Sequence, residues 1–122
     1  MFTIEFYEDN HGNSSVLEFL EGLRVKSATN KDARIQFRQM GLYIELLQNN
    51  GTNLPKNITK HIQDDIWELR PGKNRILYFF YSDDVYVLLH CFRKKTKKTP
   101  PGEIVKAKFE RDDYLRRKDK LK

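Results

Sequence analysis

Three strand-like runs follow one another in the second half of the chain, and they limit its possible folds more than any other feature. The runs cover residues 66–70, 75–81 and 85–92, which are rich in β-branched and aromatic side chains. Residues 71–74 and 82–84, where Pro, Gly, Asn, Ser and Asp gather, form short turns between them. Because strands joined by such short turns pair in opposite directions, the sequence predicts a three-stranded antiparallel meander.

The first half of the chain is predominantly helical in its pattern. Residues 2–6 alternate apolar and polar side chains as a half-buried strand does, and helical spacing follows from about residue 15 and again over residues 31–48. A last helix is expected from about Thr99, which precedes two prolines. The predicted order is β-α-α-β-β-β-α, a small α+β domain whose antiparallel sheet is packed by the two N-terminal helices. We expect a single domain over residues 1–122, with a frayed basic tail over about residues 116–122.

The basic residues are concentrated at one end of the chain. From residue 93 onward there are thirteen Lys and Arg against five Asp and Glu, a balance of +8, so the first 92 residues carry −2 of the total charge of +6. Such an asymmetry favours a polyanionic partner that is bound by one region of the chain. RNA or DNA is the first candidate for this partner, and an acidic protein is the second.

The chain carries no recognisable signal for export, for a membrane span or for a bound cofactor. It has no signal-peptide pattern, no long apolar stretch and no glycine-rich phosphate loop, and His11, His61 and His90 are too scattered for a metal site. The single Cys91 lies in an apolar run, which favours a buried, reduced thiol over a nucleophile. We therefore expect a soluble cytoplasmic protein with no metal and no cofactor.

A run of five cations and one aromatic ring directly follows the last predicted strand. It covers residues 92–100, Phe-Arg-Lys-Lys-Thr-Lys-Lys-Thr-Pro. The end of a rigid strand can hold these charges in fixed positions, which a disordered tail cannot do. Strict alternation predicts two sets of side chains on this strand, Val85, Val87, Leu89 and Cys91 toward the helices and Tyr86, Leu88, His90, Phe92 and Lys94 away from them. Arg70 and Arg75 flank the first turn and are expected close together beside this strand. The predicted concave face thus contains Arg70, Arg75, Phe92 and Lys94.

Three segments stand out as an ordered set. They are residues 68–72 (Glu-Leu-Arg-Pro-Gly), residues 75–79 (Arg-Ile-Leu-Tyr-Phe) and residues 88–100, which include the basic run. Together they resemble the RelE/ParE superfamily of bacterial toxins, most closely its HigB-like branch with phage-derived members. The order of elements matches the RelE-like fold over nearly the whole chain. The resemblance implies the toxin of a type II toxin–antitoxin pair, most often a ribosome-dependent endoribonuclease that cuts translated mRNA.

The same resemblance implies which molecules the chain meets. A cognate antitoxin neutralises such a toxin by direct binding, and in the HigB-like branch it is commonly a helix-turn-helix, HigA-like DNA-binding protein. The implied targets are the mRNA and the ribosome, and DNA is contacted only through the antitoxin.

Four side chains, with a fifth as an alternative, are candidates for the chemistry of metal-free RNA cleavage, which deprotonates a 2′-hydroxyl, stabilises a five-coordinate phosphorus and protonates the leaving 5′-oxygen. Arg70 and Arg75 suit the phosphorus, since a guanidinium matches phosphate oxygens and stays charged. Lys94 is the candidate for proton transfer, with Lys95 second, because crowded like charges favour the loss of a proton. His90 is the alternative for proton transfer, although its apolar neighbours favour a core or hydrogen-bonded role.

Binding of RNA or the ribosome is assigned to residues around these four. They are Lys73, Phe92, Arg93, Lys97 and Lys98. Phe92 can stack on an unpaired base, as aromatic side chains do in proteins that bind single-stranded RNA.

Two other functions stay open. One is a toxin of the same fold that acts on another target, as the gyrase-poisoning ParE branch does, and the other is a basic RNA- or DNA-binding module without toxicity. A lysine-rich run is often only a solvated surface, and Arg70 and Arg75 can simply pair with Glu68, Asp64 or Asp65. A cationic pocket on the rigid sheet supports the ribonuclease, whereas arginines held in ion pairs favour the other two functions.

Overall fold

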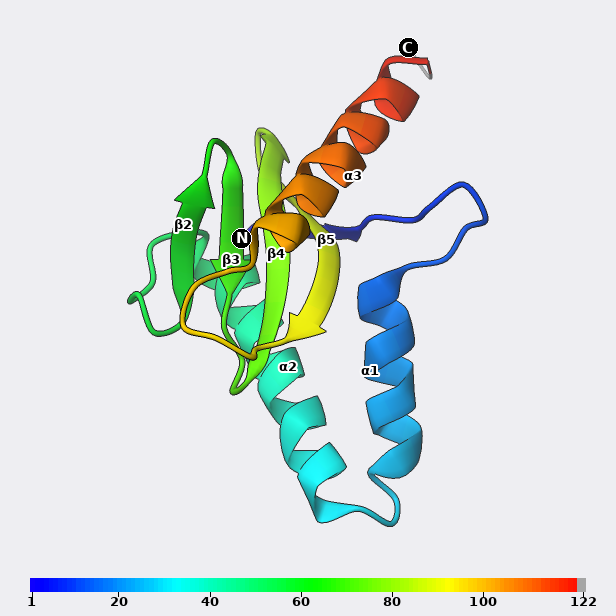
Figure 1. Ribbon diagram of the computed structural model, residues 1–122, viewed down its shortest axis with the longest axis vertical. Coiled ribbons are helices and arrows are strands. Elements are labelled where there is room, and N and C mark those ends of the chain that lie inside the picture. The colour runs from blue at the N-terminus through cyan, green and yellow to red at the C-terminus, as the bar shows by residue number, and fades with distance from the viewer. Residues whose placement is uncertain (121–122) are drawn as a thin grey trace.

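The computed structural model describes residues 1–120, and Figure 1 shows a sheet with helices on both of its faces. The elements in chain order are β1 (Thr3–Phe6), α1 (Ser15–Lys26), α2 (Lys31–Asn50), β2 (Thr59–Gln63), β3 (Ile66–Leu69), β4 (Asn74–Ser82), β5 (Val85–Arg93) and α3 (Pro101–Lys120). The predicted α+β class and order of elements are confirmed, with one strand, β2, added before the meander. β2 escapes sequence analysis because it is an edge strand whose side chains are mostly exposed and polar, such as Lys60 and His61.

The five strands form one mixed sheet in the order β1-β5-β4-β3-β2. Neighbours from β2 to β5 are antiparallel, which confirms the meander, and the register of β4 and β5 places Arg75 opposite Phe92 and Asn74 opposite Arg93. The edge strand β1 runs parallel to β5, so the expectation of a wholly antiparallel sheet is wrong at this edge. Tight turns force antiparallel pairing, but the long helical connection after β1 leaves its direction free.

Each face of the sheet has its own apolar core. The core beneath α1 and α2 contains Val16, Met40, Leu47, Tyr78 and Leu88, all fully buried. The core beneath α3 contains Leu77, Phe79, Val87, Leu89 and Ala107, also buried. The two N-terminal helices pack on the sheet as predicted, and α3 covers part of the opposite face (Figure 1).

β5 contains a bulge near its middle. His90 is paired with Leu77 and Leu88 is paired with the next residue, Tyr78, so Leu89 is an extra residue between two paired positions. An inserted residue reverses the face of the sheet toward which each following side chain points.

The bulge explains where the predicted alternation along β5 fails. After it, His90 and Phe92 face α3 and Cys91 faces α1, as predicted. Before it the prediction is wrong, because Tyr86 and Leu88 pack with the N-terminal helices and Val85, Val87 and Leu89 pack with α3. No residue type in this apolar run marks a bulge, so the sequence gives no warning of it.

α3 continues as far as Lys120, through most of the region where fraying is expected. Arg116 and Arg117 form ion pairs with Asp113 at 2.6 and 2.5 Å, and the Arg117 guanidinium also donates to the carbonyl of Glu8 at 2.6 Å. Residues 116–120 of the expected tail are therefore helical, and residues 121–122 lie outside the described residues. No helix within residues 1–120 has the length and apolar character that a membrane crossing requires.

Candidate functional site

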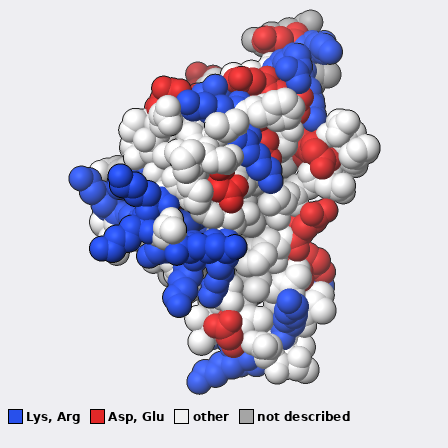
Figure 2. All heavy atoms as spheres, in the orientation of Figure 1, with Lys and Arg blue, Asp and Glu red and all other residues white. Residues whose placement is uncertain are grey.

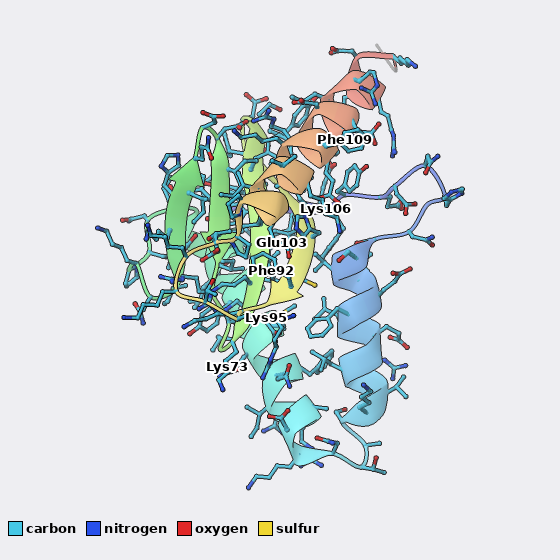
Figure 3. All side chains as sticks on the ribbon, in the orientation of Figure 1. Lys73, Phe92, Lys95, Glu103, Lys106 and Phe109 are labelled. Atoms are coloured by element: carbon cyan, nitrogen blue, oxygen red, sulfur yellow. The ribbon has the colours of Figure 1, made fainter. Side chains whose placement is uncertain are left out.

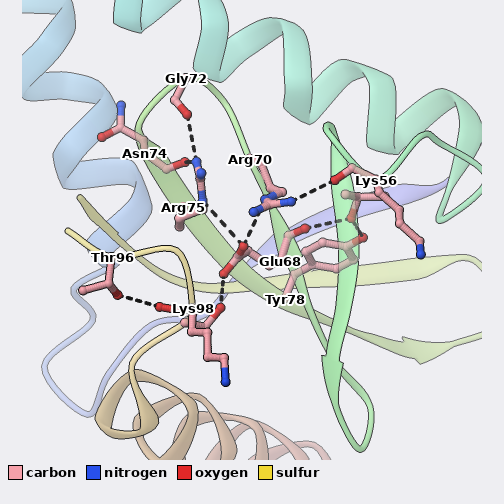
Figure 4. A network of polar contacts seen from close by, with 11 residues as sticks. Lys56, Glu68, Arg70, Gly72, Asn74, Arg75, Tyr78, Thr96 and Lys98 are labelled. Carbon is pink, nitrogen blue, oxygen red and sulfur yellow. Dashed lines mark hydrogen bonds and ion pairs between the residues drawn. The ribbon is translucent and has the colours of Figure 1, made fainter. Parts of the chain in front are cut away.

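Two arginines from neighbouring strands meet at one carboxylate, as Figure 4 shows. Arg70 directly follows β3, Arg75 is the second residue of β4, and Glu68 of β3 lies between them. Glu68 Oε1 is 3.3 Å from Arg70 Nε and 3.5 Å from Arg75 Nε. The side chains of Glu68 and Arg75 are only 3% and 9% exposed, so these charges are buried. The expected meeting of Arg70 and Arg75 is present, with a carboxylate held between them.

Backbone carbonyls hold the terminal nitrogens of both arginines. Arg75 Nη1 donates to the carbonyls of Gly72 and Asn74, each at 2.8 Å. Arg70 Nη1 donates to the carbonyl of Lys56 at 3.1 Å. Gly72 has a φ of +63°, a conformation that favours glycine, and this turn aims its carbonyl at Arg75. The two guanidiniums are therefore fixed in position by the β3–β4 turn as well as by Glu68.

The ion cluster is not fully satisfied. Burial lowers the pKa of Arg75 below its ordinary value, and the charge of Glu68 opposes that shift. Arg75 nevertheless stays protonated, because the ordinary pKa of arginine is far above neutrality. Within residues 1–120 the buried Nε of Arg70 has no hydrogen-bond partner, since its contact with Glu68 lacks hydrogen-bond geometry. Two cations thus share one carboxylate and leave a net positive charge.

The basic loop, residues 94–99, is tied to the sheet at both ends. The N–H of Lys94 donates to the carbonyl of Lys73 at 2.8 Å, and the hydroxyl of Thr99 donates to Glu68 Oε2 at 2.5 Å. Within the loop, the hydroxyl of Thr96 donates to the carbonyl of Lys98 at 2.8 Å. Glu68 therefore connects the arginine pair to the loop, which holds its lysines over the sheet.

Seven cations form what we call the cationic face: Arg70, Lys73, Arg75, Lys94, Lys95, Lys97 and Lys98. One shallow pocket in it is lined by Arg75, Phe92 and the basic loop, and a second by Arg70, Lys97 and Lys98; both reach Glu68 and Thr99. Figure 2 shows Lys and Arg gathered over the lower end of the sheet and the basic loop. The structure thus brings the predicted residues Arg70, Arg75, Phe92, Lys94, Lys95, Lys97 and Lys98, with Lys73, to one surface.

Arg93 lies apart from the cationic face. It alternates with Phe92 along β5, and its Nη1 donates to Gln36 Oε1 of α2 at 3.0 Å. Its side chain is therefore on the α2 side of the sheet. The structure separates Arg93 from the lysines with which the sequence groups it.

His90 is enclosed by α3. Its side chain is 1% exposed, its Nδ1 is 2.5 Å from Glu110 Oε1 and its Nε2 is 3.2 Å from Glu103 Oε1. Both ring nitrogens are thus occupied, and RNA can reach the imidazole only if α3 moves. This is the geometry of the hydrogen-bonded alternative rather than that of an exposed proton-transfer residue.

Sequence reasoning overlooks three polar partners in this region. Thr99 is expected only at the start of the last helix, yet its hydroxyl ties the basic loop to Glu68. Glu103 and Glu110 pass unnoticed, although their spacing of seven residues places both on one face of α3, where a buried histidine can find them. A carboxylate pair at helical spacing after a strand histidine is the pattern that could have revealed this contact.

Cys91 is partly buried and its thiol is not activated. Its Sγ lies 3.9 Å from Ser15 Oγ, and burial raises the pKa of its thiol above the ordinary value. Since the thiolate is the reactive form, we expect iodoacetamide at pH 7 to modify Cys91 about tenfold or more slowly than a cysteine in an unstructured peptide. Mass spectrometry over time measures the rate, which should rise in urea. A native rate equal to that of the peptide would contradict this placement.

Comparison with known families adds one finding to this geometry. The family model for phage-derived Gp49-like proteins matches residues 26–112, a region that contains the cationic face, the basic loop and Glu68. No curated protein gave a significant match to the chain.

Proposed function

This chain belongs to the phage-derived Gp49-like family, which is associated with the toxins of toxin–antitoxin systems, and we propose that it is such a toxin and cuts mRNA on the ribosome. The observation that carries the proposal is the cationic face, where seven Lys and Arg side chains from the β3–β4 turn, β4 and the basic loop gather with Phe92 at the end of the sheet. Electrostatic attraction to phosphates supplies much of the affinity of such a surface for RNA. The resemblance of residues 68–72, 75–79 and 88–100 to RelE/ParE toxins of the HigB-like branch supports the same activity.

The proposed reaction needs no metal or other cofactor. The 2′-hydroxyl of the RNA attacks the adjacent phosphorus and forms a bond to it, and the bond from phosphorus to the leaving 5′-oxygen breaks. Arg70 and Arg75 stabilise the charge that develops on the phosphate oxygens. Lys94, with Lys95 second, takes the proton from the 2′-hydroxyl or gives one to the leaving 5′-oxygen, and the products are a 2′,3′-cyclic phosphate and a 5′-hydroxyl. Phe92, which lines the pocket beside Arg75, stacks on an unpaired base.

An antitoxin completes the proposed system. It binds the toxin directly and prevents it from reaching the ribosome, and it carries the helix-turn-helix that contacts DNA, as in HigA-like proteins. The toxin acts in the cytoplasm, where translated mRNA is found. A small open reading frame for a helix-turn-helix protein beside this gene would support the pairing.

The ion pairs at Glu68 favour a second candidate, a toxin of the same fold that stops growth without cutting RNA. A guanidinium that already faces a carboxylate is less available to a phosphate, and both arginines are in this state. Induction of the chain in a bacterium, followed by mapping of mRNA 5′ ends, separates the candidates. New 5′ ends within translated codons support the ribonuclease, growth arrest with intact mRNA supports another target such as gyrase, and normal growth supports a non-toxic binding module.

The cationic face predicts how RNA binding depends on salt. If about five phosphates are neutralised, the affinity for single-stranded RNA should fall by roughly 100-fold between 50 and 200 mM salt, because condensed counterions are released on binding. Fluorescence anisotropy with a labelled oligonucleotide measures this slope. An affinity that does not change with salt would show that the cationic face is not the contact surface.

A further inference from the structure

A second cleft adjoins the cationic face, between α1, α2 and the end of β5. Its volume is about 410 Å³, within the roughly 300–1,000 Å³ typical of small-molecule sites. The ring of Phe19 of α1 lines it, Phe92 borders it at the end of β5, and the polar residues at its wall are Lys26, Asn30, Asp32, Gln36, Asn74 and Arg93. Phe92 lines both this cleft and the pocket of the cationic face. Figure 3 shows Phe92, Lys95 and Lys73 near one another at the lower end of the sheet. The cleft and the cationic face lie on opposite faces of the sheet and meet at the end of β5, where an RNA chain held by the cationic face can pass around the end of the sheet and place one unit in the cleft.

The polar wall of the cleft is a connected network. Gln36 Nε2 donates to Asp32 Oδ2 at 2.7 Å, and Gln36 Oε1 accepts from Asn74 Nδ2 and from Arg93 Nη1, each at 3.0 Å. Asn74, only 2% exposed, also accepts from Arg93 Nη1 at 3.4 Å. Both ends of the Gln36 amide are thus engaged, which fixes its orientation. Within residues 1–120, Asp32 Oδ1 and the Nε and Nη2 of Arg93 take part in none of these bonds and are available to a ligand.

We propose that this cleft binds an unpaired guanine base of the RNA that the cationic face holds. This inference rests on the proposed RNA target and deepens it with a base preference. Guanine presents two adjacent donors, N1–H and the 2-amino group, and a carboxylate such as Asp32 accepts both. Its O6 and N7 are acceptors that match a guanidinium such as Arg93. The ring packs against Phe19, as unstacked bases pack on aromatic side chains.

The other RNA bases match this wall less well. Adenine, cytosine and uracil each present a single donor group on the edge that pairs with other bases, so each makes one hydrogen bond to the Asp32 carboxylate where guanine makes two. The loss of one hydrogen bond to a charged group lowers the affinity. Guanine alone satisfies the carboxylate and the guanidinium together.

The test compares short uridine-rich RNAs that differ at one central position, guanosine, inosine or adenosine. Inosine lacks only the 2-amino group, so it isolates that contact with Asp32. Fluorescence anisotropy at fixed salt should show guanosine RNA bound at least about fivefold more tightly than either of the others, the lower end for a bidentate base contact. Equal affinity for the three RNAs would overturn the proposal, and it is also the result expected if the cleft takes a protein side chain instead.

Two variants of the same helix sharpen the test. Asp32→Asn should bring the guanosine-to-inosine affinity ratio to about one by weakening the binding of the guanosine RNA, while it raises the affinity for the adenosine RNA slightly because a negative charge is lost. Glu45→Gln makes the same change of charge on α2 outside the cleft, and it should leave the ratio unchanged. A ratio that survives Asp32→Asn would also overturn the proposal. Since the measurement needs binding and not cleavage, failure to bind any RNA points to the proposed function, whereas binding without a base preference points only to the cleft.

Discussion

Bacteria that express the chain with Lys94→Ala and Lys95→Ala, without an antitoxin, are expected to grow normally where the unchanged chain arrests growth. Both lysines are exposed, and both line the pocket that contains Arg75 and Phe92. Loss of the groups that move a proton in RNA cleavage typically slows the reaction by about 100-fold or more. The measurements are the growth curve after induction and the number of new mRNA 5′ ends.

The matched control removes two positive charges far from the cationic face. Arg116 and Lys120 are exposed on the last turns of α3, and Arg116→Ala with Lys120→Ala changes the net charge by the same amount. This double variant should remain toxic, which separates the position of the charges from their number. Both doubles should unfold at the same temperature as the unchanged chain, since none of the four side chains is buried. Growth arrest that persists in the double variant Lys94→Ala with Lys95→Ala would argue against any role of the basic loop in toxicity.

The parts of the fold that depend on local chemistry could be read from the sequence. The turns at 71–74 and 82–84 fix an antiparallel meander, and the meander alone brings Arg70 and Arg75 beside Phe92. The basic run follows a buried strand, which is why its lysines are held over the sheet. Short-range rules succeed here because turn type and strand period are decided by neighbouring residues.

The rest depends on contacts between distant parts of the chain. The bulge at Leu89 reverses the side that the first half of β5 presents, and no local residue type announces it. His90 is 13 residues from Glu103 and 20 from Glu110, so its partners are known only once α3 is placed on the sheet. The cleft between α1, α2 and β5 likewise exists only in three dimensions, since Gln36 and Arg93 are 57 residues apart.

The carboxylate that pairs with Arg70 and Arg75 depends on both local sequence and tertiary packing. The sequence offers Glu68, Asp64 and Asp65 as partners for the two arginines, and alternation alone does not choose among them. In the structure Asp64 forms an ion pair with Lys108 and Asp65 forms one with Arg111, both on α3. Glu68 forms the ion pairs with Arg70 and Arg75. The packing of α3 against the sheet therefore determines which carboxylate lies beside the two arginines of the candidate site.

Glu68→Ala is expected to lower the free energy of unfolding by about 3–5 kcal/mol, the usual cost of removing one partner from a buried ion pair. The change leaves Arg75, with a side chain 9% exposed, without its counter-ion and removes the acceptor of the Thr99 hydroxyl. For a domain of this size the midpoint of thermal unfolding should drop by about 10 °C or more. Glu21→Ala is the control, because Glu21 forms an ion pair with Arg24 in which both side chains are more than half exposed, and its midpoint should stay the same. Equal midpoints for the two variants would show that the cluster at Glu68 contributes little to folding.

Glu68→Gln distinguishes the structural role of this carboxylate from its effect on the arginines. The amide keeps the shape of the side chain and an oxygen that can accept from Thr99, so the loss of stability should be smaller than in Glu68→Ala. It also removes the negative charge that faces Arg70 and Arg75. If the arginines contact phosphate, the variant should bind RNA about tenfold more tightly and with a steeper dependence on salt, because two guanidiniums are released from one carboxylate. Unchanged affinity in a folded Glu68→Gln protein would mean that these arginines hold the sheet and the basic loop together, and the contact with RNA would then lie with the lysines alone.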